Sequence, residues 1–62
     1  MTAKERVEQE LKELNEKRLK LGTFITTHKM TEEESTLLFL QYYIMGQYSN
    51  ILEQRLAIWR EL

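Results

Sequence analysis

The chain contains no cysteine, no proline, two glycines and a single histidine, His28. Without cysteine there is neither a disulfide nor a thiolate zinc site, and one histidine excludes a histidine-rich metal cluster. With no proline and few glycines, little in the sequence would break a long helix. We therefore expect an all-α protein with no metal and no cofactor.

An excess of basic charge and a long apolar run are also missing. Nine Lys and Arg face ten Asp and Glu, giving a net charge of −1, whereas binding to duplex nucleic acid normally uses a basic surface. The longest apolar runs, such as Leu37–Leu40, have four residues, far short of the ~20 residues that span a bilayer, and the charged stretch Met1–Glu10 lacks the apolar segment of a signal peptide. We expect a soluble intracellular protein with no membrane and no duplex nucleic acid as partner.

Apolar residues recur at helical spacing in two segments. In the first they are Val7, Leu11, Leu14, Leu21 and Ile25, which predicts a helix over about 3–27. Polar and β-branched residues then interrupt the pattern and predict a turn at 28–31. Thr31 and Glu34 form the pattern of a capping box, which predicts the start of a second helix over about 32–62. The sequence thus predicts a single domain, 1–62, folded as an antiparallel two-helix hairpin.

Folding the chain about this turn predicts which residues face each other. Leu21 is placed near Leu38, Leu14 near Met45, Leu11 near Tyr48, Val7 near Leu52 and Arg18 beside Gln41. The second predicted helix is longer by roughly six residues, or about 9 Å at the rise of an α-helix. Its end, with Ala57, Ile58, Trp59 and Leu62, is therefore expected to project beyond the first helix.

A line of polar residues divides the most apolar surface of the chain. Gln41, Tyr48 and Arg55 are spaced by seven, so on a helix they stack in one row. One flank of this polar row contains Leu37, Leu40, Ile44, Ile51 and Ile58, and the other contains Leu38, Met45, Leu52, Leu56 and Trp59.

The apolar arc around the polar row spans roughly 160°, wider than the ~100° stripe that one packing surface needs. Single domains of this length bury only about 60% of the surface of the unfolded chain, so their stability is marginal without a further source. We therefore expect hairpins to assemble through the second helix into a bundle, a homodimer or a homotetramer.

No arrangement typical of catalysis is present. The chain has no nucleophile with a nearby base, no glycine-rich phosphate loop and no pair of metal-binding histidines. His28 has the position of a dipole partner at a helix end, and Glu32, Glu33 and Glu34 those of a solvated first turn. We expect the protein not to be an enzyme.

Two sets of side chains are candidates for binding a ligand. The stretch 41–50 is rich in aromatic and amide groups that can stack on bases or contact base edges, namely Gln41, Tyr42, Tyr43, Tyr48 and Asn50. The alternative is that the tyrosines fill helix interfaces; Tyr42 and Tyr43 are expected to point away from the polar row. Arg18 and Arg55 lie at the centres of apolar faces, where each can clamp a phosphate or pair with an acid such as Glu10 or Glu34.

Gly46 lies in the middle of the second predicted helix, where glycine costs about 1 kcal/mol relative to alanine. Close approach of a neighbouring helix, close approach of a ligand, or simple tolerance would each account for it. The sequence leaves these three explanations open.

Several segments together resemble a known group of proteins. They are Glu5-Arg6-Val7, Glu13-Leu14, Lys17, Leu21 and Phe24-Ile25, followed by the residues Gln41, Met45, Tyr48, Ile51-Leu52 and Arg55-Leu56. The pattern covers nearly the whole chain and resembles the short helical-hairpin proteins of tailed phages, often named after a crAss-like phage protein. These in turn look similar to the anti-CBASS sponges, which hold cyclic dinucleotides in an oligomer.

The resemblance implies a cyclic dinucleotide ligand, sequestered without cleavage in the cytoplasm of an infected bacterium. It implies phosphate contacts by arginines and lysines and base stacking by tyrosines, with Arg55, Tyr48 and Lys17 matching the pattern. Tyr42, Tyr43 and Gly46 fall outside it. Two other functions remain open at this point: a helical adaptor or inhibitor that captures a protein partner, and a structural phage component that assembles with itself.

Overall fold

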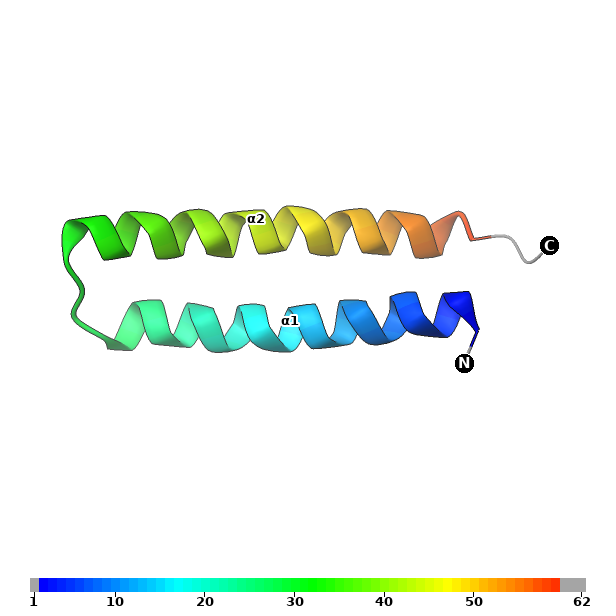
Figure 1. Ribbon diagram of the computed structural model, residues 1–62, viewed down its shortest axis with the longest axis horizontal. Helices are drawn as coiled ribbons and strands as arrows, with labels where there is room; N and C mark the ends of the chain where they lie inside the picture. The colour runs from blue at the N-terminus through cyan, green and yellow to red at the C-terminus, as the bar shows by residue number, and fades with distance from the viewer. Residues whose placement is uncertain (1, 60–62) are drawn as a thin grey trace.

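The protein is a hairpin of two antiparallel α-helices, as the sequence predicts (Figure 1). The computed structural model describes residues 2–59. Helix α1 spans Ala3–Thr27 and helix α2 spans Glu32–Ala57. The two helices pack against each other along their length, joined by a short turn at one end.

Each helix begins at a threonine that supplies a missing hydrogen-bond partner. The Thr2 hydroxyl accepts from the Glu5 backbone N–H at 3.1 Å, and the Thr31 hydroxyl accepts from the Glu34 N–H at 3.2 Å. The first bond of the predicted capping box is therefore present at Thr31. Such a cap contributes about 1 kcal/mol because it satisfies an N–H that has no partner within the helix.

The end of α1 also follows from its side chains. The Thr26 and Thr27 hydroxyls donate to backbone carbonyls one turn earlier, which competes with continuation of the helix. His28 then takes an extended backbone conformation, with φ −114°, and its ring stacks on Phe24 with centroids 4.0 Å apart. The turn occupies the predicted place.

The end of α2 corrects the sequence prediction. The helix ends at Ala57, not near residue 62, and is one residue longer than α1, with 26 residues against 25. Beyond Ala57 the chain passes the start of α1 and has less of that helix to pack on, and helices of this kind depend on packing for their stability. The expected projection of the helix is therefore absent up to Trp59, which is half-buried; Leu62 lies outside the described residues.

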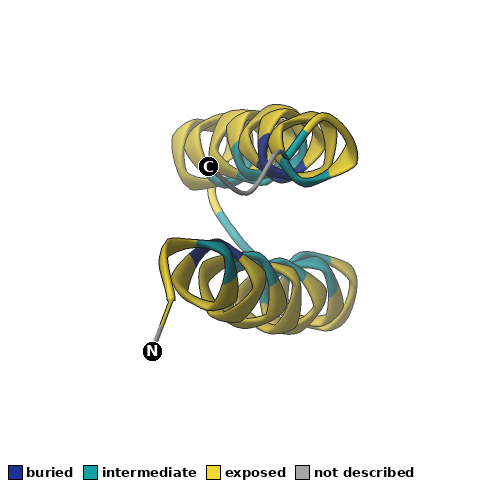
Figure 2. Ribbon diagram, turned by 90° about the vertical axis from the view of Figure 1, so that its right-hand side faces the viewer, coloured by how far each residue is buried: buried dark blue, intermediate teal, exposed yellow. Residues whose placement is uncertain are grey.

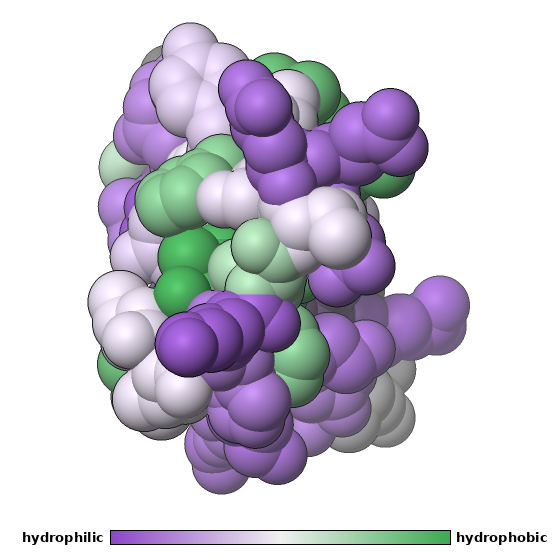
Figure 3. Space-filling view, turned by 90° about the vertical axis from the view of Figure 1, so that its left-hand side faces the viewer, coloured by the Kyte–Doolittle hydropathy of each residue, from purple (hydrophilic) through white to green (hydrophobic). Residues whose placement is uncertain are grey.

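The core between the helices is narrow. Among the described residues, the buried apolar side chains are Val7 and Leu52, and Leu52 is 0% exposed. Half-buried residues extend this core along the facing sides of both helices, while the outer sides are exposed (Figure 2). At the turn, hydrophobic side chains lie in the middle of the end face with hydrophilic ones around them (Figure 3). A single hairpin therefore has little buried apolar surface.

Candidate functional site

The polar row of α2 lies on the border between covered and uncovered apolar surface. One flank faces α1 and is buried or half-buried; this inner flank consists of Leu38, Met45, Leu52, Leu56 and Trp59. The other faces solvent with 52% to 77% of each side chain exposed; this outer flank consists of Leu37, Leu40, Ile44, Ile51 and Ile58. Gln41, Tyr48 and Arg55 between them are exposed. One hairpin thus covers one flank only, as the width of the arc predicts.

Tyr48 connects the polar row to α1. Its hydroxyl donates a hydrogen bond to the Glu10 carboxylate. This bond, with partial desolvation and the negative charge of Glu10, raises the pKa of the Tyr48 hydroxyl, while the positive charge of Arg55 opposes the rise. The charge of Arg55 therefore acts on the same hydroxyl that Glu10 binds, and the direct contact across the helices is the one between Tyr48 and Glu10.

Glu10 was one of the acids expected to pair with an arginine. In the structure it accepts a hydrogen bond from the Tyr48 hydroxyl. The row therefore meets α1 through a neutral hydroxyl bound to a carboxylate. Arg55 remains exposed at the end of the row, where its N–H groups are accessible to an anion.

Arg18 was expected beside Gln41, and in the structure its contacts are with Tyr42, the next residue. Its Nε donates to the Tyr42 backbone carbonyl at 3.4 Å, and its guanidinium lies over the Tyr42 ring, 4.3 Å from the ring centroid. One residue along a helix is a rotation of about 100°. Arg18 is consequently turned away from the polar row and joins the helices through a cation–π contact.

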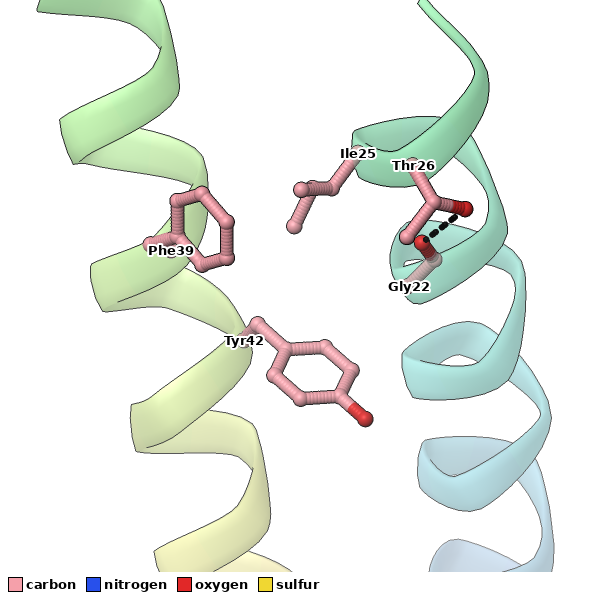
Figure 4. Close-up of a pocket in the computed structure, with 5 residues that line it drawn as sticks. All are labelled: Gly22, Ile25, Thr26, Phe39 and Tyr42. Carbon is pink, nitrogen blue, oxygen red and sulfur yellow. Dashed lines mark hydrogen bonds between the residues drawn. The ribbon is translucent and has the colours of Figure 1, made fainter.

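Tyr42 points toward α1 and is half-buried, on a side of α2 away from the polar row. With Phe39 it projects from α2 toward Ile25 and Gly22 on α1 (Figure 4). These residues and Thr26 line a shallow, mostly apolar pocket of about 170 Å³ near the turn. A Cβ on Gly22 would lie 3.1 Å from the Tyr42 ring. The absence of a side chain at Gly22 therefore makes room for this ring.

Gly46 has an explanation in the same contact. A Cβ added there would lie 2.7 Å from Arg18 Nη2 and 2.9 Å from Arg18 Cζ. The close neighbour that the sequence left open is therefore the side chain of Arg18 from the other helix. Both glycines of the chain make room for the Arg18–Tyr42 pair.

We expect the effect of Gly46→Ala on stability to depend on Arg18. In an Arg18→Met background, alanine should stabilise the protein by about 1 kcal/mol through helix propensity. With Arg18 present, the gain should be smaller by at least about 0.5 kcal/mol, the coupling usual for residues in contact. Urea unfolding of the four proteins at one concentration, followed by circular dichroism, measures the difference. Equal gains in both backgrounds would show that Arg18 and Gly46 do not interact.

A third connection between the helices was missed in the sequence. Ser49, which is buried, donates from its hydroxyl to Asn15 Oδ1 at 2.7 Å. Neither residue belongs to the apolar pattern, and only the register between the helices brings them together. Asn15 is exposed and lies between Leu14 and Glu16, so the sequence carried no signal for this pair.

The remaining predicted ligand residues are dispersed over the exposed surface. Lys17 lies on α1, and Tyr43 and Asn50 lie on α2 outside the inner flank; Tyr43 is 63% exposed. Of the candidates, Tyr48 contacts α1 through Glu10, and Arg18 and Tyr42 form a separate pair between the helices. Among the described residues, Lys17, Gln41, Tyr43 and Asn50 join neither contact through a hydrogen bond.

Within residues 2–59, no group of three or more His, Cys, Asp or Glu side chains is placed to hold a metal ion. Over the same residues, neither helix has the length and apolar character needed to cross a membrane.

Comparison with known proteins identifies a family. The family model described as Sequestin matches residues 1–58. Comparison with curated proteins gave no significant match, and comparison with solved structures gave none either. The family model spans almost the whole hairpin, including both helices and the polar row. The chain therefore belongs to the Sequestin family.

Proposed function

We propose that this protein is a phage anti-defence factor that binds cyclic oligonucleotide immune signals and sequesters them without cleavage. The name of its family indicates sequestration. The proposed place of action is the cytoplasm of the infected bacterium, where such signals are made. Binding without turnover needs no catalytic group, and we propose that the protein is not an enzyme.

The exposed polar row is the observation that carries this proposal. Arg55 offers N–H donors in the fixed fork that suits phosphate. Tyr48 and Gln41 extend the row along α2 and supply a ring and an amide. Exposed apolar side chains border the row on its outer side, so a ligand bound there would meet charge, aromatic surface and hydrocarbon together.

We propose that a second copy of the hairpin covers the outer flank and completes this site. Four large apolar side chains of α2, and Ile58 just after its end, are more than half exposed, and burial of each contributes about 1.5–3 kcal/mol. Because the outer flank adjoins the polar row, the second copy would close over Arg55 and Tyr48. The ligand would then be held between subunits of a homodimer or homotetramer.

The candidates then divide into two roles. We assign ligand contact to Arg55 and Lys17 at phosphates and to Tyr48 and Tyr43 at the bases, with Gln41 and Asn50 selecting among bases. Arg18 and Tyr42 are engaged with each other across the helices, and we assign them to holding the hairpin that positions the row.

Calorimetry with a panel of cyclic di- and trinucleotides tests the proposal. We expect at least one ligand to bind, to be recovered intact by chromatography, and to lose about 10- to 100-fold in affinity on Arg55→Ala, the usual effect of removing a charged hydrogen-bond partner. Lys29→Ala makes the same charge change at the opposite end of the hairpin and should leave affinity unchanged. Absence of binding up to millimolar ligand would contradict the proposal.

The outer flank favours one alternative, capture of an apolar helix of another protein in the helix-in-groove manner. This function requires the flank to be free in solution. A protein that is monomeric, and binds no cyclic nucleotide, would support the adaptor. A self-assembling protein that binds none would support a structural phage component.

A further inference from the structure

The contact between Glu10 and Tyr48 fixes how the two helices align on the face that carries the polar row. Seven residues along a helix return to nearly the same side. Lys17, seven residues after Glu10, therefore lies on the same face as Gln41, seven residues before Tyr48, and both side chains are exposed. Lys17 and Gln41 thus lie toward the turn, and Arg55 lies toward the far end of the hairpin.

These two cationic side chains are far apart within one hairpin. Fourteen residues of α2 separate Gln41 from Arg55, or about 21 Å at the rise of an α-helix. Lys17, which lies on the same side of the hairpin as Gln41, is at a similar distance from Arg55. A cyclic dinucleotide is a compact ring, and its phosphates lie much closer together than this. The separation favours a site that takes Lys17 from one chain and Arg55 from another.

The exposed apolar side chains of the outer flank are arranged symmetrically along the chain. Leu37 and Ile58 lie equally far from the midpoint between residues 47 and 48, and so do Ile44 and Ile51. All four are 54% to 77% exposed. If two copies pack with antiparallel α2 helices, a two-fold axis at this midpoint buries each of the four against another member of the set.

The polar row has nearly the same symmetry. Gln41 and Arg55 lie seven residues on either side of Tyr48. The axis that pairs the outer flanks therefore places Arg55 beside the partner's Gln41, on the face that also carries the partner's Lys17. Leu40, the remaining member of the outer flank, then meets the apolar stem of the partner's Arg55.

We propose that two hairpins pair through antiparallel α2 helices about an axis at residues 47–48, and that each ligand site takes Arg55 from one chain and Lys17 and Gln41 from its partner. This inference rests on the proposed function and assigns the residues of its site to chains. Each dimer has two such sites on one face, and the Tyr48 side chains of both copies lie between them.

Charge alone would favour another register. An axis three residues nearer the turn places Arg55 opposite the partner's Glu34, but it also places Leu37 opposite Leu52, which is already buried in its own hairpin. An exposed ion pair contributes much less than the burial of large apolar side chains. A parallel dimer would bring the two copies of Arg55 together, where like charges repel.

Disulfides between introduced cysteines test the register, because the chain has no cysteine of its own. Two cysteines can be bridged only if their Cα atoms come within about 7 Å. Mild oxidation of a mixture of Ile44→Cys and Ile51→Cys should link the two variants to each other. Each variant alone should stay largely unlinked, because its two cysteines would lie about 10 Å apart along the helices. Leu37→Cys and Ile58→Cys should behave in the same way.

A disulfide of Ile44→Cys with itself would overturn the register, because it requires a parallel dimer or the axis that pairs Arg55 with Glu34. The absence of any intermolecular disulfide in the mixtures would overturn it as well. Leu19→Cys, which lies on the outer side of α1 and is exposed, is the control for random collision and should give only background linkage.

Mixing two defective variants tests the sharing of the site, with cyclic di-AMP, cyclic di-GMP and cyclic tri-AMP as calorimetric probes. Arg55→Ala and Lys17→Ala should each lower affinity by about 10-fold or more. In an equimolar mixture about half of the dimers are heterodimers with one intact site each, so about a quarter of all sites should regain wild-type affinity. Arg55→Ala mixed with the double variant Lys17→Ala, Arg55→Ala should regain none.

Native mass spectrometry detects the heterodimers, and no recovery in a mixture that contains them would overturn the shared site while leaving sequestration standing. A wild type that binds none of the probes would overturn the proposed function and the shared site with it, and the disulfides would then decide the register by themselves. Lys17 and Arg55 are exposed, so circular dichroism should show the variants folded.

Discussion

Leu52→Ala is expected to lower the free energy of unfolding by about 3 kcal/mol, within the 2–5 kcal/mol typical of truncating a buried leucine. Leu52 is 0% exposed and lies at the centre of the inner flank. Removing three of its carbons leaves a cavity that two helices with one contact face cannot easily close. Native domains have about 0.05–0.15 kcal/mol of stability per residue, so the loss is a large part of the total for a chain this small.

Urea unfolding at fixed protein concentration measures the effect, with Leu19→Ala as the matched control. Leu19 lies on the outer side of α1 and is 72% exposed, so its truncation should change stability by less than about 0.5 kcal/mol. The same loss for Leu52 and Leu19 would mean that the two helices do not pack on the inner flank.

The sequence predicted the two-helix hairpin almost completely because the relevant signals are local. The limits of α1 and the start of α2 depend on side chains within one turn of each end, such as Thr31 at its cap. The far end of α2 depends instead on where its partner helix begins. The position of that end therefore depends on both helices together. The apolar pattern of the sequence does not mark it, because the pattern continues beyond Ala57 to Trp59.

The candidate site was predicted in part for the same reason. The polar row and its two flanks follow from helical spacing alone, and the structure places them as expected. Which residues of α1 meet the row depends on how the two helices pack, and Arg18 contacts Tyr42 where Gln41 was expected. The partnership of Glu10 with Tyr48 needs both the register and the side-chain conformations, which spacing does not supply.

Charge on the outer flank is expected to dissociate the protein and abolish ligand binding together. The double variant Ile44→Glu, Ile51→Glu replaces two side chains that are 61% and 54% exposed in the single hairpin. If a second copy buries them, the substitution removes about 3–6 kcal/mol of apolar burial and adds two unpaired charges to the interface. The dissociation constant should rise by at least about 100-fold.

Light scattering at tens of micromolar protein measures the assembly: the wild type should have a multiple of the 7.5 kDa chain mass, and the double variant should have the mass of one chain. Leu19→Glu, on the outer side of α1, is the control and should keep the wild-type mass. Ligand affinity should fall with the assembly, because the polar row lies beside the outer flank and is only half enclosed by one hairpin. A wild type with the mass of one chain would contradict the shared site, and a dissociated variant that still binds ligand would place the whole site on a single hairpin.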